Sequence, residues 1–152
     1  MTYPSLVRVW LIAALALACS SPSSGAPPAF CASDPRVEAF SLGLQSVGAG
    51  GTKVAIESAT PSVVQQGLNE WTVSIHDASG APVDGTVTIT PYMPDHGHGS
   101  PTLATITPKG GGDYDISGIN LSMRGVWQIT IAVQSATVSD SAVFTFCVDG
   151  AS

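Results

Sequence analysis

The sequence predicts an all-β protein, an immunoglobulin-like antiparallel β-sandwich of about seven strands. Several segments alternate apolar and polar residues with a period of two and are rich in Val, Ile, Thr and aromatic residues, as half-buried strands are. Turn sequences rich in Gly, Asp and Ser separate these segments, and beyond the N-terminal apolar run no window keeps helical spacing. About seven short strands at this spacing are typical of the immunoglobulin architecture.

Four segments carry the alternation most clearly, and each has one apolar face. The apolar faces are Trp71, Val73 and Ile75, then Val87 and Ile89, then Trp127, Ile129, Ile131 and Val133, and finally Phe144, Phe146 and Val148. Shorter candidate strands lie at 54–56, 103–107 and 114–116. Tyr114 follows a glycine-rich turn, so it is expected either as a tyrosine corner or simply as a buried tyrosine. His76 falls on the polar face of its strand and is expected in solvent.

The N-terminus is expected to be a targeting segment. Residues 1–18 contain the apolar run Val9 to Ala18, which is too short to span a bilayer and fits a signal peptide. The sequence 15–19 resembles a bacterial lipobox, in which Cys19 would carry a diacylglycerol, although Ala16 stands where Leu is usual. Ordinary secretion with cleavage near Ala26 stays open. Residues 19–30 would then be a lipidated cysteine and flexible tether, and residues 31–150 the folded domain.

Charge and cysteine content narrow the function. Removal of residues 1–18 takes only Arg8 from the charged residues and leaves a net charge of −7. This acidic balance argues against nucleic acid and anionic membrane surfaces as partners, so contact with a membrane is expected only through the lipid. Cys31 and Cys147 are expected to form a disulfide outside the cytoplasm, the alternative being a copper thiolate at Cys147. No nucleophile elbow or phosphate-binding loop occurs, and no enzyme activity is expected.

The segment 93–99 holds two of the three histidines and one of the three methionines. Imidazole and thioether ligands suit copper, and the thioether favours Cu(I). If the segment is extended, His96 and His98 project to the same side, and a turn at Pro94-Asp95 would bring the sulfur of Met93 alongside. Asp95 is a harder ligand that suits zinc better than Cu(I). Solvent-exposed histidines in a polar loop are the alternative.

Met123 is a further candidate ligand with an alternative role. It shares the parity of Ile119 and Leu121, which favours a core methionine. It also lies beside the turn at Arg124-Gly125, and a position at the rim of the sandwich would let its sulfur join the histidine segment.

Two sequence blocks resemble the YtkA-like/FixH-like domain family. They are Met93-Pro94-x-His96-Gly97-His98-Gly99 and Met123-Arg124-Gly125-Val126-Trp127, and the resemblance extends over about residues 52–148. It implies an extracytoplasmic β-sandwich associated with copper handling and cytochrome oxidase maturation. By position, the residues that it implies as metal ligands are Met93, His96, His98 and Met123. The cysteine pair and Asp95 depart from the family pattern.

These observations together predict a protein of the cell envelope that binds copper, as a Cu(I) chaperone or buffer. Its partners would be the metal ion and an envelope protein that donates or accepts copper. The alternative is a non-catalytic immunoglobulin-like interaction module, for which the fold alone argues.

Overall fold

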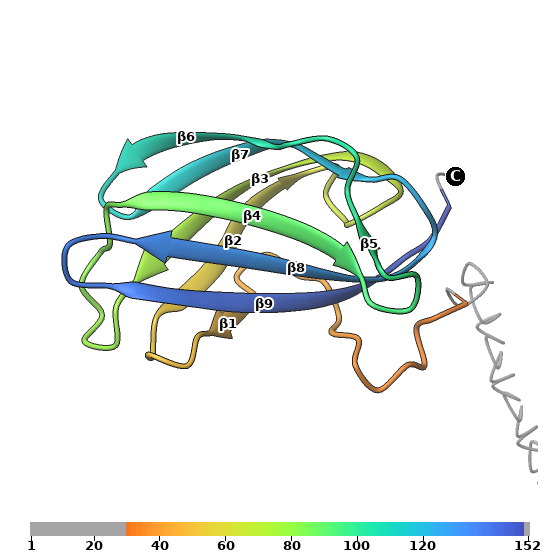
Figure 1. Cartoon of the computed structure of the whole chain (residues 1–152), viewed down its shortest axis with the longest axis horizontal. Coiled ribbons are helices and arrows are strands. Elements are labelled where there is room, and N and C mark those ends of the chain that lie inside the picture. The colour runs from red at the N-terminus through yellow and green to blue at the C-terminus, as the bar shows by residue number, and fades with distance from the viewer. Residues whose placement is uncertain (1–29, 151–152) are drawn as a thin grey trace, which may run out of the picture.

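Nine β-strands form two antiparallel sheets that pack face to face in the computed structural model, which describes residues 30–150 (Figure 1). Within this range there is no helix, and so none that is long and apolar enough to cross a membrane. The strands are β1 (Gln45–Val47), β2 (Lys53–Thr60), β3 (Gly67–His76), β4 (Thr86–Met93), β5 (His98–Gly99), β6 (Thr105–Gly110), β7 (Asp113–Leu121), β8 (Gly125–Gln134) and β9 (Ser139–Val148). The predicted signal peptide and the predicted lipidation of Cys19 lie outside the described residues.

The strand order confirms the predicted immunoglobulin-like sandwich. One sheet runs β1-β2-β3-β7-β6 and the other β5-β4-β8-β9. The segments β2-β3-β7-β6 and β5-β4-β8-β9 correspond to the A-B-E-D and C′-C-F-G orders of immunoglobulin domains. Seven strands have six or more residues, whereas β1 and β5 have three and two. These two short strands were not predicted, because so few residues show no periodicity.

The core lies between the sheets and consists of the predicted apolar faces. Val73, Ile75, Trp127, Ile129 and Phe144 are all fully buried. The expected strand at 103–107 begins later than predicted, since β6 starts at Thr105 and Leu103 is 96% exposed. His76, expected in solvent, is half-buried at the end of β3.

Tyr114 is a buried tyrosine rather than a tyrosine corner. Its hydroxyl donates to the carbonyl of Val83 at 2.9 Å and accepts the N–H of Gly85 at 2.8 Å, so it joins β7 to the turn before β4. The tyrosine corner belongs to the strand equivalent to β8 and bonds to backbone a few residues upstream. The second of the two sequence expectations therefore holds.

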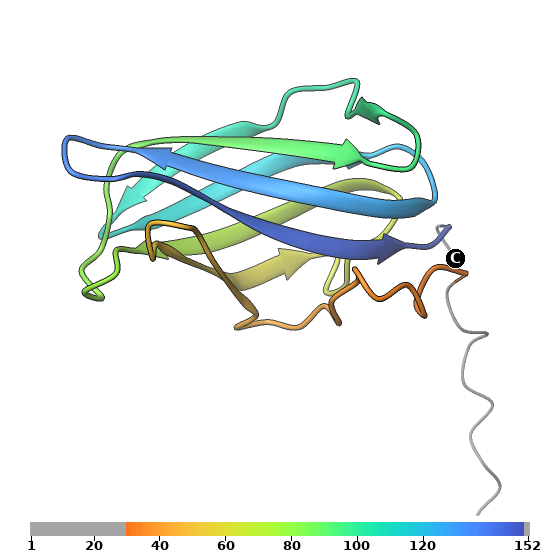
Figure 2. The same ribbon diagram turned by 60° about the horizontal axis from the view of Figure 1, so that its bottom comes forward.

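The segment 30–38, here called the N-terminal strap, runs beside the end of β9 (Figure 2). The predicted disulfide ties the strap to β9 through Cys31 and Cys147, whose Cα atoms are 5.4 Å apart. Glu38 adds two hydrogen bonds with Thr145 of β9, because its N–H donates to the Thr145 carbonyl at 2.8 Å and its carboxylate accepts the Thr145 N–H at 2.9 Å. The alternative role of Cys147 as a thiolate ligand is wrong.

Candidate metal site at the end of the sandwich

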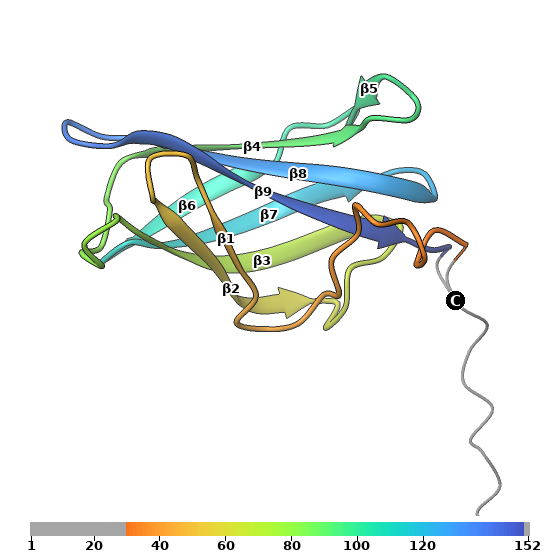
Figure 3. The same cartoon turned by 90° about the horizontal axis from the view of Figure 1, so that it is seen from below.

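The histidine segment forms a hairpin between β4 and β5, which projects at the end of the four-stranded sheet (Figure 3). The carbonyl of Met93 accepts the N–H of His96 at 3.2 Å and of Gly97 at 2.9 Å, which closes the turn. Gly97 has a φ of 69°, a left-handed conformation that glycine adopts without strain. Met93 and His98 are therefore strand residues, and His96 lies in the turn.

The two imidazoles of the hairpin lie close enough to share one ion. His96 and His98 are exposed, with ring centroids 5.8 Å apart and ring planes tilted by 57°. A metal–nitrogen bond of about 2.0 Å places an ion about 3.2 Å from each ring centre, so a shared ion needs centroids within about 6.4 Å. The observed separation meets this limit.

A backbone contact also orients one of these rings. Nδ1 of His98 lies 3.1 Å from the carbonyl oxygen of Gly99. When Nδ1 carries the proton and donates to that carbonyl, the lone pair of Nε2 remains free for a metal. Histidine ligands commonly have this arrangement of a backbone carbonyl behind the ring.

The thioether of Met93 starts on the same face of the hairpin as His98. The two residues are directly opposite in the β4–β5 pairing, where Cβ atoms are about 5 Å apart and side chains share a face. Met93 is fully buried, and its Cε lies 2.5 Å from the place that a Cβ on residue 125 would occupy. Gly125 therefore makes room for Met93, and the end of this side chain reaches the start of β8.

Met123 lies in the turn between β7 and β8, two residues before Gly125. Its side chain is at the surface, 41% exposed, and its carbonyl accepts the indole N–H of Trp127 at 2.9 Å. The core position that periodicity favours is wrong, because β7 ends at Leu121 and the alternation stops there. The β4–β5 and β7–β8 turns lie at the same end of the sandwich (Figure 1).

The two sequence blocks thus meet in space through the contact of Met93 with Gly125, while Trp127 holds the second turn. His96 and His98 are brought together, and the side chain of Met93 is buried against Gly125. Met123 lies at the same end of the sandwich, but the structure gives no contact between its side chain and either imidazole. Among residues 30–150 no three His, Cys, Asp or Glu side chains gather as a metal site would require.

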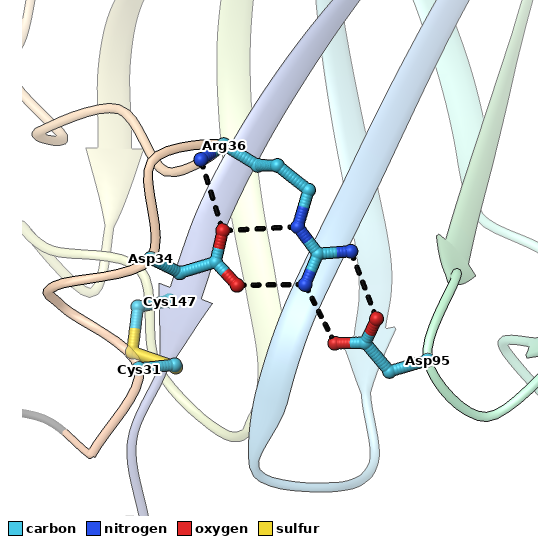
Figure 4. A network of polar contacts seen from close by, with 5 residues as sticks. All are labelled: Cys31, Asp34, Arg36, Asp95 and Cys147. Atoms are coloured by element: carbon cyan, nitrogen blue, oxygen red, sulfur yellow. Dashed lines mark hydrogen bonds and ion pairs between the residues drawn. A yellow bond between two sulfur atoms is a disulfide. The ribbon is translucent and has the colours of Figure 1, made fainter.

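Two strap residues that the sequence did not nominate reach the hairpin (Figure 4). The guanidinium of Arg36 donates to both carboxylate oxygens of Asp95, at 2.8 Å each, and to both oxygens of Asp34, at 2.9 and 2.7 Å. These bonds lower the pKa of Asp34 to about 2 and hold the pKa of Asp95 below its ordinary value. The sequence offered little indication of this contact, because 59 residues separate Arg36 from Asp95. The predicted disulfide was the one feature that placed the strap near the folded domain's last strand.

A shallow hollow of about 330 Å³ lies between the strap, the hairpin and the start of β8. Asp34, Asp95, His96, Arg124 and Gly125 are among the residues that line it. Arg124 forms an ion pair with Asp149 at 3.2 Å and stacks over the ring of Phe30 at 4.8 Å. The hollow therefore has one imidazole, and its two carboxylates are both bound to Arg36.

Comparison with known proteins agrees with the sequence blocks. A family model described as YtkA-like matches residues 48–132, more than half of the chain. No curated protein and no solved structure matches this chain. The match includes both blocks, whereas the strap and β9 lie outside it. The chain belongs to the YtkA-like family.

Proposed function

We propose that this protein binds copper at the β4–β5 hairpin and serves as a Cu(I) chaperone or buffer outside the cytoplasm. The observation that carries the proposal is the pair of exposed imidazoles, His96 and His98, whose ring centroids are 5.8 Å apart, with Met93 paired directly opposite His98. Two nitrogens and one sulfur form a soft donor set that suits Cu(I). Met123, at the same end of the sandwich, is the proposed fourth ligand.

Exposure of the imidazoles is what a copper donor needs. An ion held by side chains at the surface is open to attack by the ligands of a partner, so it can pass between proteins by exchange of one ligand at a time. The partner would be an envelope protein that donates or accepts copper. An electron-transfer site of the blue-copper type needs a cysteine thiolate, and Cys147 is bonded to Cys31.

A competition titration with Cu(I) and a chromophoric chelator tests the proposal. We expect the purified protein to bind one equivalent and the double variant His96→Ala/His98→Ala to bind at least about a hundredfold more weakly, because changes even outside the ligand shell cost 10–100-fold. His76→Ala is the matched control, since it removes the third histidine from the end of β3 and leaves the hairpin unchanged. Equal affinity of the parent and the double variant would overturn the proposal and leave the interaction module as the remaining function.

The sulfur ligands are tested separately. Met93→Leu keeps the volume of the buried side chain while removing its sulfur, and volume-conserving changes of this kind usually cost less than about 1.5 kcal/mol. We expect weaker Cu(I) binding from Met93→Leu, and a smaller loss from Met123→Leu. Unchanged Cu(I) affinity in both variants would reduce the site to its two histidines.

A further inference from the structure

We propose that Arg36 sets the metal preference of this site, because it binds the carboxylates of Asp34 and Asp95 and so keeps hard oxygen ligands away from the ion. This inference rests on the proposed copper function and adds the reason why a harder metal such as zinc would be disfavoured.

Arg36 donates one hydrogen bond to each oxygen of both carboxylates. Its Nη1 and Nη2 donate to the two oxygens of Asp95, and its Nε and Nη2 donate to the two oxygens of Asp34. Paired, charge-assisted bonds of this planar kind are stronger than bonds between neutral groups, and lysine cannot reproduce their geometry. A guanidinium does not lose its proton in proteins, so the arrangement persists at any pH at which the carboxylates are charged.

The strap keeps Arg36 beside the hairpin. Cys31 is bonded to Cys147, which is paired with Val126 at the start of β8, and Glu38 is hydrogen-bonded to β9 at the other end of the strap. Arg36 lies between these two attachments. Its position is therefore a property of the folded domain rather than of one exposed side chain.

The chemistry of the hollow explains why this matters. Asp34, Asp95 and His96 line the same hollow, and two carboxylates with an imidazole form a donor set that zinc accepts. In the folded chain both carboxylates are bound to Arg36, and no three His, Cys, Asp or Glu side chains of the described residues gather as a metal site. Arg36 also places a positive charge beside the site, which repels a divalent ion more than a monovalent one. The imidazoles of His96 and His98, which suit copper, stay exposed and make no bond to Arg36.

The test compares zinc affinity in variants of the whole protein by isothermal titration calorimetry. We expect Arg36→Met to bind Zn²⁺ at least about tenfold more tightly than the parent, since it releases both carboxylates and removes a charge. The gain should disappear in Arg36→Met/Asp95→Asn. Arg124→Met is the matched control, because Arg124 lines the same hollow but pairs with Asp149. Cu(I) affinity is compared between the parent and Arg36→Leu, which adds no thioether, and should differ by less than about threefold.

An equal gain in Arg36→Met and Arg124→Met would overturn the inference, since charge alone would then explain it. A gain in Zn²⁺ affinity that remains in Arg36→Met/Asp95→Asn would also overturn the inference. If Arg36→Met fails to fold, the Zn²⁺ affinity of Asp95→Asn alone tests the inference. We expect it to equal that of the parent. A tenfold loss would show that Asp95 binds Zn²⁺ even with Arg36 present, and would overturn the inference. The copper proposal is tested separately, by the Cu(I) titration of the parent and of His96→Ala/His98→Ala.

Discussion

Gly125 is the residue through which the two sequence blocks meet, and its substitution by alanine gives the sharpest test of the packing. A Cβ at this position would lie 2.5 Å from Cε of Met93, and the φ of Gly125 is 143°, where other residues are strained. Overpacking of a buried site costs about 1–3 kcal/mol and the backbone strain about 1–2 kcal/mol more. We therefore expect Gly125→Ala to lower the free energy of unfolding by about 2–5 kcal/mol.

The assay is urea denaturation followed by tryptophan fluorescence, and it includes a control and a rescue. Gly43 has a φ of 80°, and no atom lies within 4 Å of the place that a Cβ would occupy there, so Gly43→Ala should show the strain alone, about 1–2 kcal/mol. Met93→Ala removes the Cε atom that a Cβ on residue 125 would meet. The double variant Met93→Ala/Gly125→Ala should therefore lose at least about 1 kcal/mol less free energy of unfolding than the sum of the two single variants. Equal losses for both glycines, together with strict additivity, would refute the contact.

Three further predictions concern contacts away from that glycine. Tyr114→Phe should lower the free energy of unfolding by about 1–3 kcal/mol, measured by urea denaturation, because it leaves the buried carbonyl of Val83 and the partly buried N–H of Gly85 without their partner. Asp34 should titrate by NMR with a pKa of about 2, moving toward 3.8 in Arg36→Met. Because this pKa is lowered by folding, the stabilisation by the ion pair is present above pH 3.8 and is lost as the pH falls through about 2. Replacement of Cys31 and Cys147 by serine should destabilise the protein by up to about 5 kcal/mol in thermal and urea unfolding, since the bond closes a long loop.

Each of these predictions has a result that contradicts it. Tyr92→Phe is the control for Tyr114, because Tyr92 is 39% exposed on β4, and an equal loss in both variants would discount the buried hydrogen bond. An Asp34 pKa near 3.8 in the parent would mean that Arg36 does not pair with it in solution. Unchanged stability of the serine double variant would show that the disulfide contributes nothing to the stability of the sandwich.

The sequence predicted the sandwich because alternation along a strand is a local property. In the strands around Trp71, Trp127 and Phe144, a few residues of alternation are enough to identify the buried face. A period of two is the period of a β-strand and not of a helix. The same reasoning failed for Met123, since periodicity does not report where a strand ends. The hydrogen-bond partners of the buried Tyr114 hydroxyl were likewise not predicted, since they lie far away in the sequence.

The candidate site also combines features that the sequence predicted with features that only the tertiary structure decided. The residue types of the β4–β5 hairpin were visible in the sequence, because adjacent residues with soft donors stay adjacent in any fold. That Gly125 makes room for Met93, and that Arg36 binds Asp95 across 59 residues, follows only from how the sheets and the strap pack. The sequence by itself determined the strands and the donors near one another in the chain. The tertiary structure decided which distant side chains meet them, because such contacts depend on the register of the strands and the path of the strap, which no local pattern encodes.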